Sequence, residues 1–216
     1  MPVGAPCNIC ESEDEIFNSI TKIDVDNPTP KVVQTGVRNT VGFDWHPVTG
    51  DLWFTDNGRD MLGDDLPSCE LNHAPKEGMH FGYPYCHEGD VPDPKFGEKR
   101  SCNEFEKPVV KLGAHVAPLG IEFYTGQQFP ATYKHQAIIA EHGSWNRSKK
   151  VGYKITAVQL DAQNKATSTK VFAEGWLDKE ADEAWGRPVD IEQLTDGSIL
   201  ISDDFADAIY RIYYEK

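Results

Sequence analysis

Short apolar or alternating runs dominate the pattern of hydrophobic and polar positions along the chain. No long window repeats apolar residues at the i, i+3, i+4 and i+7 spacing of an amphipathic helix. Turn residues, such as HPVTGD at 46–51 and TDGS at 195–198, separate the runs. Eleven runs are predicted to be strands: 19–25, 31–37, 41–47, 51–57, 120–126, 136–142, 152–160, 170–176, 188–194, 198–204 and 208–214.

These runs follow a repeated order. A strand, a tight turn and a second strand, as in 41–57 and 188–204, are followed by a further outer strand such as 208–214. The unit recurs every ~45 to 70 residues, which is typical of β-propeller blades with four antiparallel strands. An ordinary β-sandwich is the alternative, and the repeated hairpin favours the propeller. We therefore predict an all-β chain, with about four blades in a single partial propeller domain over 1–216.

Residues 58–113 interrupt the repeat. They are rich in Gly, Pro and acidic residues and show little strand pattern. A loop of this length inside a compact domain is usually functional or tied down by a metal or a disulfide. We predict one long loop here.

The composition is that of a globular protein with an acidic surface. The chain has 216 residues, with 21 basic and 35 acidic side chains and a formal net charge of −14. Nucleic acid is thereby excluded as a partner, because phosphate binding needs clustered Lys and Arg. An anionic membrane surface is disfavoured as well, and the sequence has no apolar run long enough to predict a membrane span.

The five cysteines leave several readings open. Cys7 and Cys10 form a CxxC that favours a local disulfide or two small buried thiols. A zinc site would need a second ligand pair and a redox motif a βαβ unit, and the sequence shows neither. A c-type haem site is excluded, because Glu11 follows Cys10 at the position where the haem attachment motif requires His. Cys86 and Cys102 bracket a Pro- and Gly-rich loop that a disulfide would staple, which favours an oxidising compartment. The N-terminus has no charged-then-apolar signal peptide.

Carboxylates gather in the long segment. Asp60, Asp64, Asp65 and Glu70, with Asn72 beside them, suit a hard cation such as calcium. Their spacing is not that of an EF-hand, and a solvated acidic loop is the alternative reading.

Three arginines lie near the ends of predicted strands: Arg38, Arg147 and Arg187. In a propeller such positions converge on the central channel, where guanidinium groups would bind an anionic ligand. Salt bridges at the surface are the alternative. The sequence has no P-loop, GxGxxG or GxSxG motif, so a nicotinamide dehydrogenase or a serine hydrolase is not indicated.

Several phrases resemble the soluble glucose/sorbosone dehydrogenases that use pyrroloquinoline quinone (PQQ), and most closely their sorbosone dehydrogenase-like branch. They include VGAPCNIC, DNGRD, HFGYPYCHEGDVPDP, HVAPLG, HGSWNR and RPVDIEQLTDGSILISDD, and they cover nearly the whole chain. The resemblance implies a six-bladed β-propeller that oxidises an aldose or sorbosone-type sugar by hydride transfer to PQQ, with calcium. It also implies a periplasmic or secreted protein that passes electrons to a dye, quinone or cytochrome.

The resemblance also assigns site residues. Arg38, Asn39, His115, Arg147 and Arg187 are the implied PQQ-binding residues. The main-chain carbonyls of Gly58 and Arg59 are expected to hold the cofactor's calcium, and Glu70 with the Phe81 carbonyl a second, structural calcium.

The family's catalytic His lies upstream of VGAPCN. We therefore expect this chain to be the C-terminal portion of such an enzyme, with the missing blades on another chain or on a longer chain. A non-catalytic propeller that serves as a binding module is the main alternative. A calcium-dependent sugar lactonase is a further one, which would need Glu, Asn and Asp ligands in the channel.

Overall fold

The computed structural model describes residues 1–215, which are almost entirely strands and loops. The helical elements are two single turns of 3-10 helix, η1 (Cys102–Glu104) and η2 (Ala131–Tyr133). Within residues 1–215 no α-helix is formed, so the prediction of an all-β chain is confirmed.

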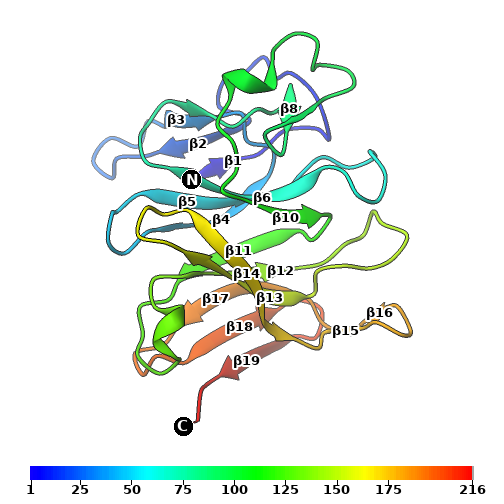
Figure 1. Cartoon of the computed structure of the whole chain (residues 1–216). Helices are drawn as coiled ribbons and strands as arrows, with labels where there is room; N and C mark the ends of the chain where they lie inside the picture. The colour runs from blue at the N-terminus through cyan, green and yellow to red at the C-terminus, as the bar shows by residue number, and fades with distance from the viewer. Residues whose placement is uncertain (216) are drawn as a thin grey trace.

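Four sheets follow one another along the chain (Figure 1). The first has the order β1 (Pro2–Val3), β2 (Ser19–Lys22), β3 (Lys31–Thr35), β7 (Met79–His80). The second has the order β4 (Thr40–Trp45), β5 (Leu52–Asp56), β6 (Ser68–Ala74), β10 (Val110–Ala114). The third has the order β11 (Pro118–Phe123), β12 (Ala137–Glu141), β13 (Lys154–Leu160), β14 (Ala166–Glu174). The fourth contains β17 (Pro188–Gln193), β18 (Ile199–Asp203) and β19 (Ala208–Ile212).

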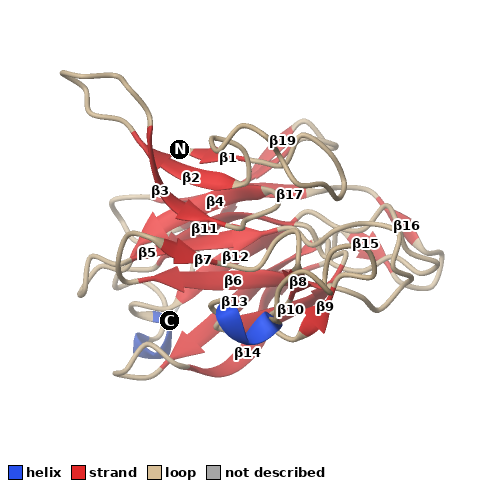
Figure 2. Cartoon of the chain, turned by 90° about the horizontal axis from the view of Figure 1, so that it is seen from above, coloured by secondary structure: helices blue, strands red, loops and turns tan. Residues whose placement is uncertain are grey.

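Two short strand pairs lie outside these sheets. They are β8 (Cys86–His87) with β9 (Val91–Pro92), and β15 (Leu177–Asp178) with β16 (Glu183–Ala184). Seen from above, both pairs lie at the same end of the molecule as most of the long loops (Figure 2).

The arrangement of the sheets is that of a β-propeller. The strands β4, β11 and β17, which open the second, third and fourth sheets, lie next to one another, and each sheet continues outward from them as an antiparallel meander. Successive blades of a propeller pack in this way around a central axis. The predicted propeller is confirmed, and the β-sandwich alternative is wrong.

The strand β1 occupies the place of a second strand in its sheet. In the second and third sheets, the second strand (β5 or β12) contacts the first strand of the next sheet (β11 or β17). In the first sheet it is β1 that contacts the first strand of the next sheet, β4. In the part of the chain that the structure describes, no strand pairs with the inner side of β1. The inner face of β4 is consequently open, and Val41 and Trp45 on this strand are exposed.

Apolar side chains fill the space between neighbouring sheets. Phe54 and Phe81 pack between the first and second sheets, with ring centroids 4.9 Å apart. Trp53 and Phe123 pack edge to face between the second and third, at 5.6 Å. Each large side chain buried in this way contributes roughly 1.5–3 kcal/mol relative to an exposed one.

All eleven predicted strand runs contain a strand. The prediction of one long loop over 58–113 is wrong, because this segment contributes β6 and β10 to the second sheet and β7 to the first. The strand β6 was missed because Glu70 and Asn72 are buried within it, so the expected alternation of apolar and polar residues is absent.

Two disulfides are formed, Cys7–Cys10 and Cys86–Cys102. The second one staples the loop that carries η1, as its sequence position suggested. Cys69 is the remaining cysteine and is buried, and burial raises the pKa of its thiol to about 11. The CxxC therefore forms the local disulfide, which was one of the readings left open.

Candidate functional site

A repeated geometry marks one end of three of the sheets. Thr40 pairs with Asp56, Pro118 with Glu141 and Pro188 with Asp203, so each first strand begins opposite an acidic residue that ends the second strand. A register irregularity follows each of these pairs. The loops that leave these ends form the right-hand side of the molecule in Figure 1.

A pocket of about 230 Å³ lies among these loops. It is lined by Arg38, Asn39, Asn57, Gly58, Asp60, Cys69, His115, Ala117, Leu119 and Trp145. Five residues named from the sequence, Arg38, Asn39, Gly58, Asp60 and His115, therefore meet in one place. The exposed indole of Trp145 lies beside them.

The guanidinium group of Arg38 is held by several partners. Its Nη2 lies 3.1 Å from Asp60 Oδ2 and 3.0 Å from Asn8 Oδ1. Its Nε donates to the Asn8 carbonyl at 3.1 Å, and Nη1 donates to the Asn57 carbonyl at 3.3 Å. These four bonds occupy four of the five N–H donors of the side chain, which leaves one donor for a ligand.

His115 is buried, and its Nε2 lies 2.8 Å from the Gly63 carbonyl. A carbonyl oxygen only accepts, so Nε2 carries the hydrogen, and Nδ1 of the neutral ring is left as an acceptor. The residue has a positive φ of 64°, and Ala117 has one of 51°. This conformation is costly for residues other than Gly and is frequent at functional sites.

The other predicted cations do not line the pocket. Arg147 pairs with Asp65 at 3.0 Å, and Arg187 pairs with Asp204 at 3.0 Å. His142 Nε2 lies 3.1 Å from the same carboxylate of Asp204.

Three arginines at matched positions were expected, and the strand register does not show them. In the fourth sheet, Arg187 directly precedes Pro188, the first residue that pairs with the second strand. In the second sheet, the first such residue is Thr40, so the position that matches Arg187 is Asn39. Arg38 lies one residue earlier. Arg147 lies in the loop beyond β12. The sequence does not reveal this offset, because the pairing between strands sets which residues occupy matching positions.

Three of the predicted calcium ligands line a second, small cavity of about 10 Å³, enough for about one water molecule or ion. Gly58, Glu70 and Phe81 line it together with Asp56. Burial, and then the charge of Asp56, raises the pKa of Glu70 to about 8. Burial also raises the pKa of Asp56 to about 6. Within residues 1–215 no three His, Cys, Asp or Glu side chains are grouped to hold a metal, so main-chain carbonyls would have to complete the ligand set.

Arg59 does not line this cavity. Its Nη1 lies 2.6 Å from Asp93 Oδ2, which also lies 2.9 Å from His87 Nε2. Only the Arg59 carbonyl is therefore compatible with the predicted metal role.

The loop carboxylates proposed as calcium ligands are dispersed. Asp60 pairs with Arg38 and Asp65 with Arg147, whereas the carboxylate of Asp64 accepts from the amide of Ser148 at 3.0 Å. The first two of these carboxylates have a cationic partner, so the acidic loop does not form one cation site.

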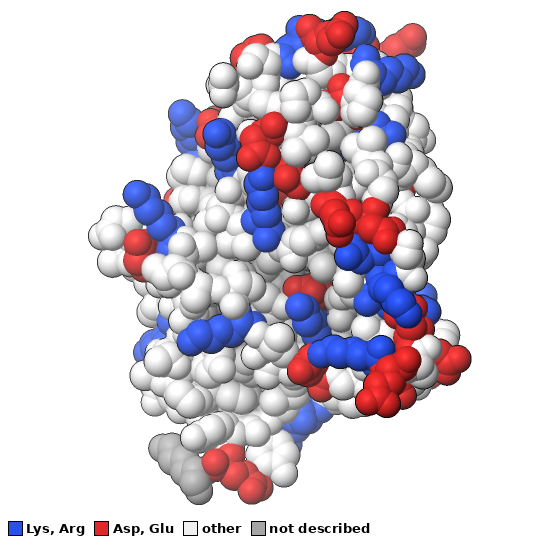
Figure 3. All heavy atoms as spheres, turned by 45° about the vertical axis from the view of Figure 1, so that its right-hand side comes forward, with Lys and Arg blue, Asp and Glu red and all other residues white. Residues whose placement is uncertain are grey.

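Figure 3 shows the side of the molecule that carries these loops. Acidic and basic side chains are interspersed on it. The ion pair of Lys179 with Glu174, 2.7 Å apart, is one example of the pairing. On this face, basic side chains therefore lie beside acidic ones.

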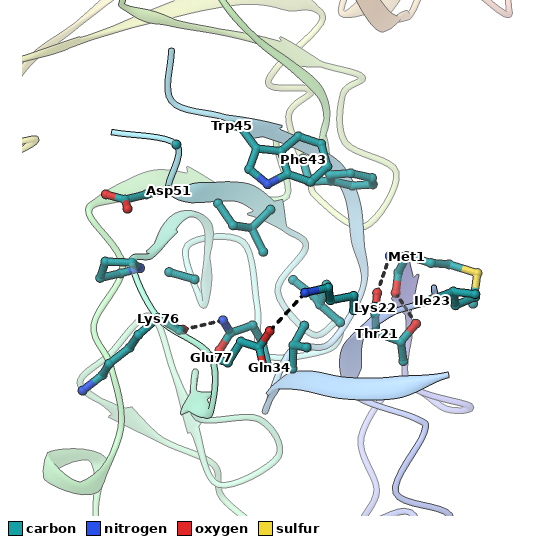
Figure 4. Close-up of a pocket in the computed structure, with 16 residues that line it drawn as sticks. Met1, Thr21, Lys22, Ile23, Gln34, Phe43, Trp45, Asp51, Lys76 and Glu77 are labelled. Carbon is teal, nitrogen blue, oxygen red and sulfur yellow. Dashed lines mark hydrogen bonds and ion pairs between the residues drawn. The ribbon is translucent and has the colours of Figure 1, made fainter. Parts of the chain in front are cut away.

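An apolar groove of about 490 Å³ lies elsewhere, between the first two sheets (Figure 4). Met1, Phe43 and Trp45 line it, and none of the predicted site residues does. Because Trp45 ends β4 whereas Arg38 precedes that strand, the groove is at the opposite end of the sheet from the pocket. It exists because β1 pairs with β2 over two residues, while β5 pairs with β6 over five.

The fold and the pocket define a β-propeller with a site at the loop end of its sheets. The sequence profile of the TrAA12-like family matches residues 16–215. The chain therefore belongs to the TrAA12-like family.

An uncharacterized protein of Borreliella burgdorferi is 46% identical over 199 residues, which cover 91% of this chain and 52% of that protein. The chain thus spans about half the length of this curated relative.

Solved structures share the fold. A family AA12 carbohydrate-active enzyme from Trichoderma reesei has a TM-score of 0.83 at 23% identity, covering 97% of this chain and 63% of its own. The PQQ domain of pyranose dehydrogenase from Coprinopsis cinerea, in its holo form, has a TM-score of 0.80 at 21% identity, covering 99% and 66%. The PQQ-bound aldose sugar dehydrogenase from Streptomyces coelicolor has a TM-score of 0.61 at 18% identity, covering 91% and 52%.

Among the described residues, no helix is long and apolar enough to cross a membrane.

Proposed function

We propose that this chain is the quinone-binding portion of a PQQ-dependent sugar dehydrogenase of the sorbosone-dehydrogenase type. The observation that carries the proposal is the pocket that joins Arg38, Asn39 and His115 with the exposed ring of Trp145. A flat polycarboxylate such as PQQ needs a cation, hydrogen-bonding groups and an aromatic surface, and this pocket offers each of them. The printed descriptions of two structural neighbours name PQQ.

The chain's own residues would bind and orient the cofactor. Arg38 would use its remaining N–H on a carboxylate, and His115 would accept a hydrogen bond at Nδ1. Trp145 would cover one face of the ring system and exclude water from it. Arg147 and Arg187 would contribute from neighbouring loops once they exchange their Asp partners for the ligand.

The carbonyls of Gly58 and Arg59 would hold a calcium ion at the cofactor. Glu70 and the Phe81 carbonyl would hold a second calcium within the protein. The small cavity supports the second site, because Glu70 and Phe81 line it together with Asp56. Carboxylate and carbonyl oxygens are the ligands that suit a hard cation.

The chemistry that bound PQQ supplies is acceptance of a hydride from the sugar. The general base is expected on a His upstream of this chain, so a second polypeptide or a longer chain would complete the enzyme. A periplasmic or secreted location and a separate electron acceptor belong to the same proposal.

The experiment is a titration of the folded chain with PQQ, with and without calcium, followed by quinone absorbance and by melting temperature. Saturable binding that requires calcium supports the proposal. A folded chain that binds no PQQ favours the non-catalytic binding module instead.

A further inference from the structure

Asn8 contacts two residues of the pocket although it does not line the pocket itself. Its side-chain oxygen accepts from Arg38 Nη2 at 3.0 Å and from the Asp60 amide at 2.8 Å. Its Nδ2 donates to the Asp60 carbonyl at 3.1 Å, and its main-chain oxygen accepts from Arg38 Nε at 3.1 Å. Asn8 therefore connects the strand start that carries Arg38 with the loop that carries Asp60.

A disulfide fixes Asn8 in this place. The residue lies within the short ring that the Cys7–Cys10 bond closes. The hydroxyl of Tyr83 accepts from the Cys10 amide at 3.0 Å, and it lies 3.7 Å from Cys7 Sγ and 3.5 Å from the Asn8 carbonyl. The ring is thus anchored at both of its ends on one phenol.

The contacts decide where the guanidinium of Arg38 points. Two of its nitrogens are bonded to Asn8, and the side chains of Arg38 and Asp60 are only 14% and 20% exposed. A half-buried cation held in this way is oriented before a ligand arrives, which reduces the cost of binding. Without the Asn8 side chain, Nη2 of Arg38 would lose one of its two acceptors and keep Asp60, while Nη1 and Nε would keep the main-chain carbonyls of Asn57 and Asn8.

We propose that Asn8 is a positioning residue for the anion-binding pocket, and that the Cys7–Cys10 disulfide holds it in place. The identity of the anion as PQQ rests on the proposed function, whereas the positioning of Arg38 does not. Opening the disulfide transfers two electrons and two protons from a dithiol reductant, which becomes a disulfide itself, and leaves two thiols on Cys7 and Cys10. The freed loop then no longer fixes Asn8, and the affinity for the anion falls.

The alternative is that Asn8 only stabilises the fold. A stabilising role predicts a lower melting temperature and an unchanged pocket. The two roles are separated by a measurement on Arg38 itself.

The experiment uses the full chain labelled with nitrogen-15 and four variants: Asn8→Ala, Asn8→Asp, Cys7→Ser with Cys10→Ser, and Asn27→Ala. The hydrogen-exchange rate of the Arg38 Nη2–H groups, which donate to the Asn8 side chain, is measured by NMR, with the signals identified by their loss in Arg38→Ala. PQQ affinity in calcium is measured in parallel. Asn27 is exposed in the loop between β2 and β3 and serves as the matched control.

The expected result is a rise of about tenfold or more in Arg38 Nη2–H exchange for Asn8→Ala and for the double serine variant, with a matching loss of about tenfold in PQQ affinity. Asn8→Asp keeps an oxygen acceptor and should restore slow exchange. Asn27→Ala should match the wild type. Exchange and affinity that stay within about twofold of the wild type in Asn8→Ala, while the melting temperature falls, would overturn the proposal.

The two proposals fail separately. If the wild-type chain binds no PQQ, the proposed function fails, and the exchange rates alone decide whether Asn8 positions Arg38. If PQQ binds but exchange and affinity do not respond to Asn8→Ala, the positioning role fails and the proposed function stands.

Discussion

Asp56 and Asp203 occupy the same place in two different sheets. Each is the last residue of a second strand and pairs with the first residue of the strand before it. Asp56 accepts from the amide of Asn39 at 2.7 Å, and Asp203 accepts from the amide of Arg187 at 2.9 Å. Buried carboxylates thus fix the main chain at two of the residues that the proposed site uses.

Removal of the Asp56 carboxylate should destabilise the chain strongly. It accepts from the amides of Arg38 and Asn39 and from the hydroxyl of Thr40. Asp56→Ala would leave these donors without a partner in a buried place, at a cost of about 3 kcal/mol or more. Urea denaturation checks this, with the exposed Asp24→Ala as the control. Equal stabilities of the two variants would show that water replaces the carboxylate at no cost.

Glu122 should make the stability depend on pH. Burial, and then repulsion from Asp44, Glu192 and Asp190, raises the pKa of Glu122 from 4.5 to about 7. The folded chain therefore keeps this proton to a higher pH than the unfolded chain, and the free energy of unfolding should fall as the pH rises from 4.5 through 7. We expect a fall of about 1 kcal/mol, since the carboxyl is half-buried and screened by solvent.

Glu122→Gln should remove this part of the pH dependence and gain stability over the wild type at pH 8. Denaturation curves at several pH values measure the difference, with Glu98→Gln as a control that keeps the wild-type profile. Parallel profiles for Glu122→Gln and the wild type would contradict the interpretation.

Calcium should stabilise the chain through Glu70. Binding to the folded state alone adds about 2.7 kcal/mol at a hundredfold excess over the dissociation constant. In a domain of this size that corresponds to a rise in melting temperature of about 5 to 10 °C. Glu70→Gln should abolish the rise, and Glu98→Gln, an exposed site, should keep it. A calcium effect of equal size in both variants would place the ion elsewhere.

Arg187 should contribute to cofactor affinity from the edge of the site. Its Nε donates to Asp204, and its guanidinium lies 5.2 Å from the ring of Phe205. Arg187→Ala should weaken PQQ binding by about tenfold, measured by quinone fluorescence. An unchanged affinity would remove this residue from the proposed site.

Much of the fold was predictable from the sequence, because most strands show apolar residues on a face that packs against the next sheet. The strand β6 was not, because Glu70 and Asn72 are buried in it and bonded to each other at 2.9 Å. Trp145 lies in the HGSWNR motif, but no local pattern shows that its ring borders the pocket. The role of Asn8 depends on a contact between segments 52 residues apart, and no local pattern reports such a contact.

The most direct test of the central claim compares PQQ binding by the wild type, Arg38→Ala and Arg211→Ala in the presence of calcium. Arg211 also pairs with an aspartate, Asp196, but it lies on β19 outside the pocket. We predict that the wild type and Arg211→Ala bind PQQ equally and that Arg38→Ala loses about tenfold to a hundredfold in affinity. Equal affinity of all three proteins, or no binding by the folded wild type, would contradict the proposal that this pocket holds the quinone.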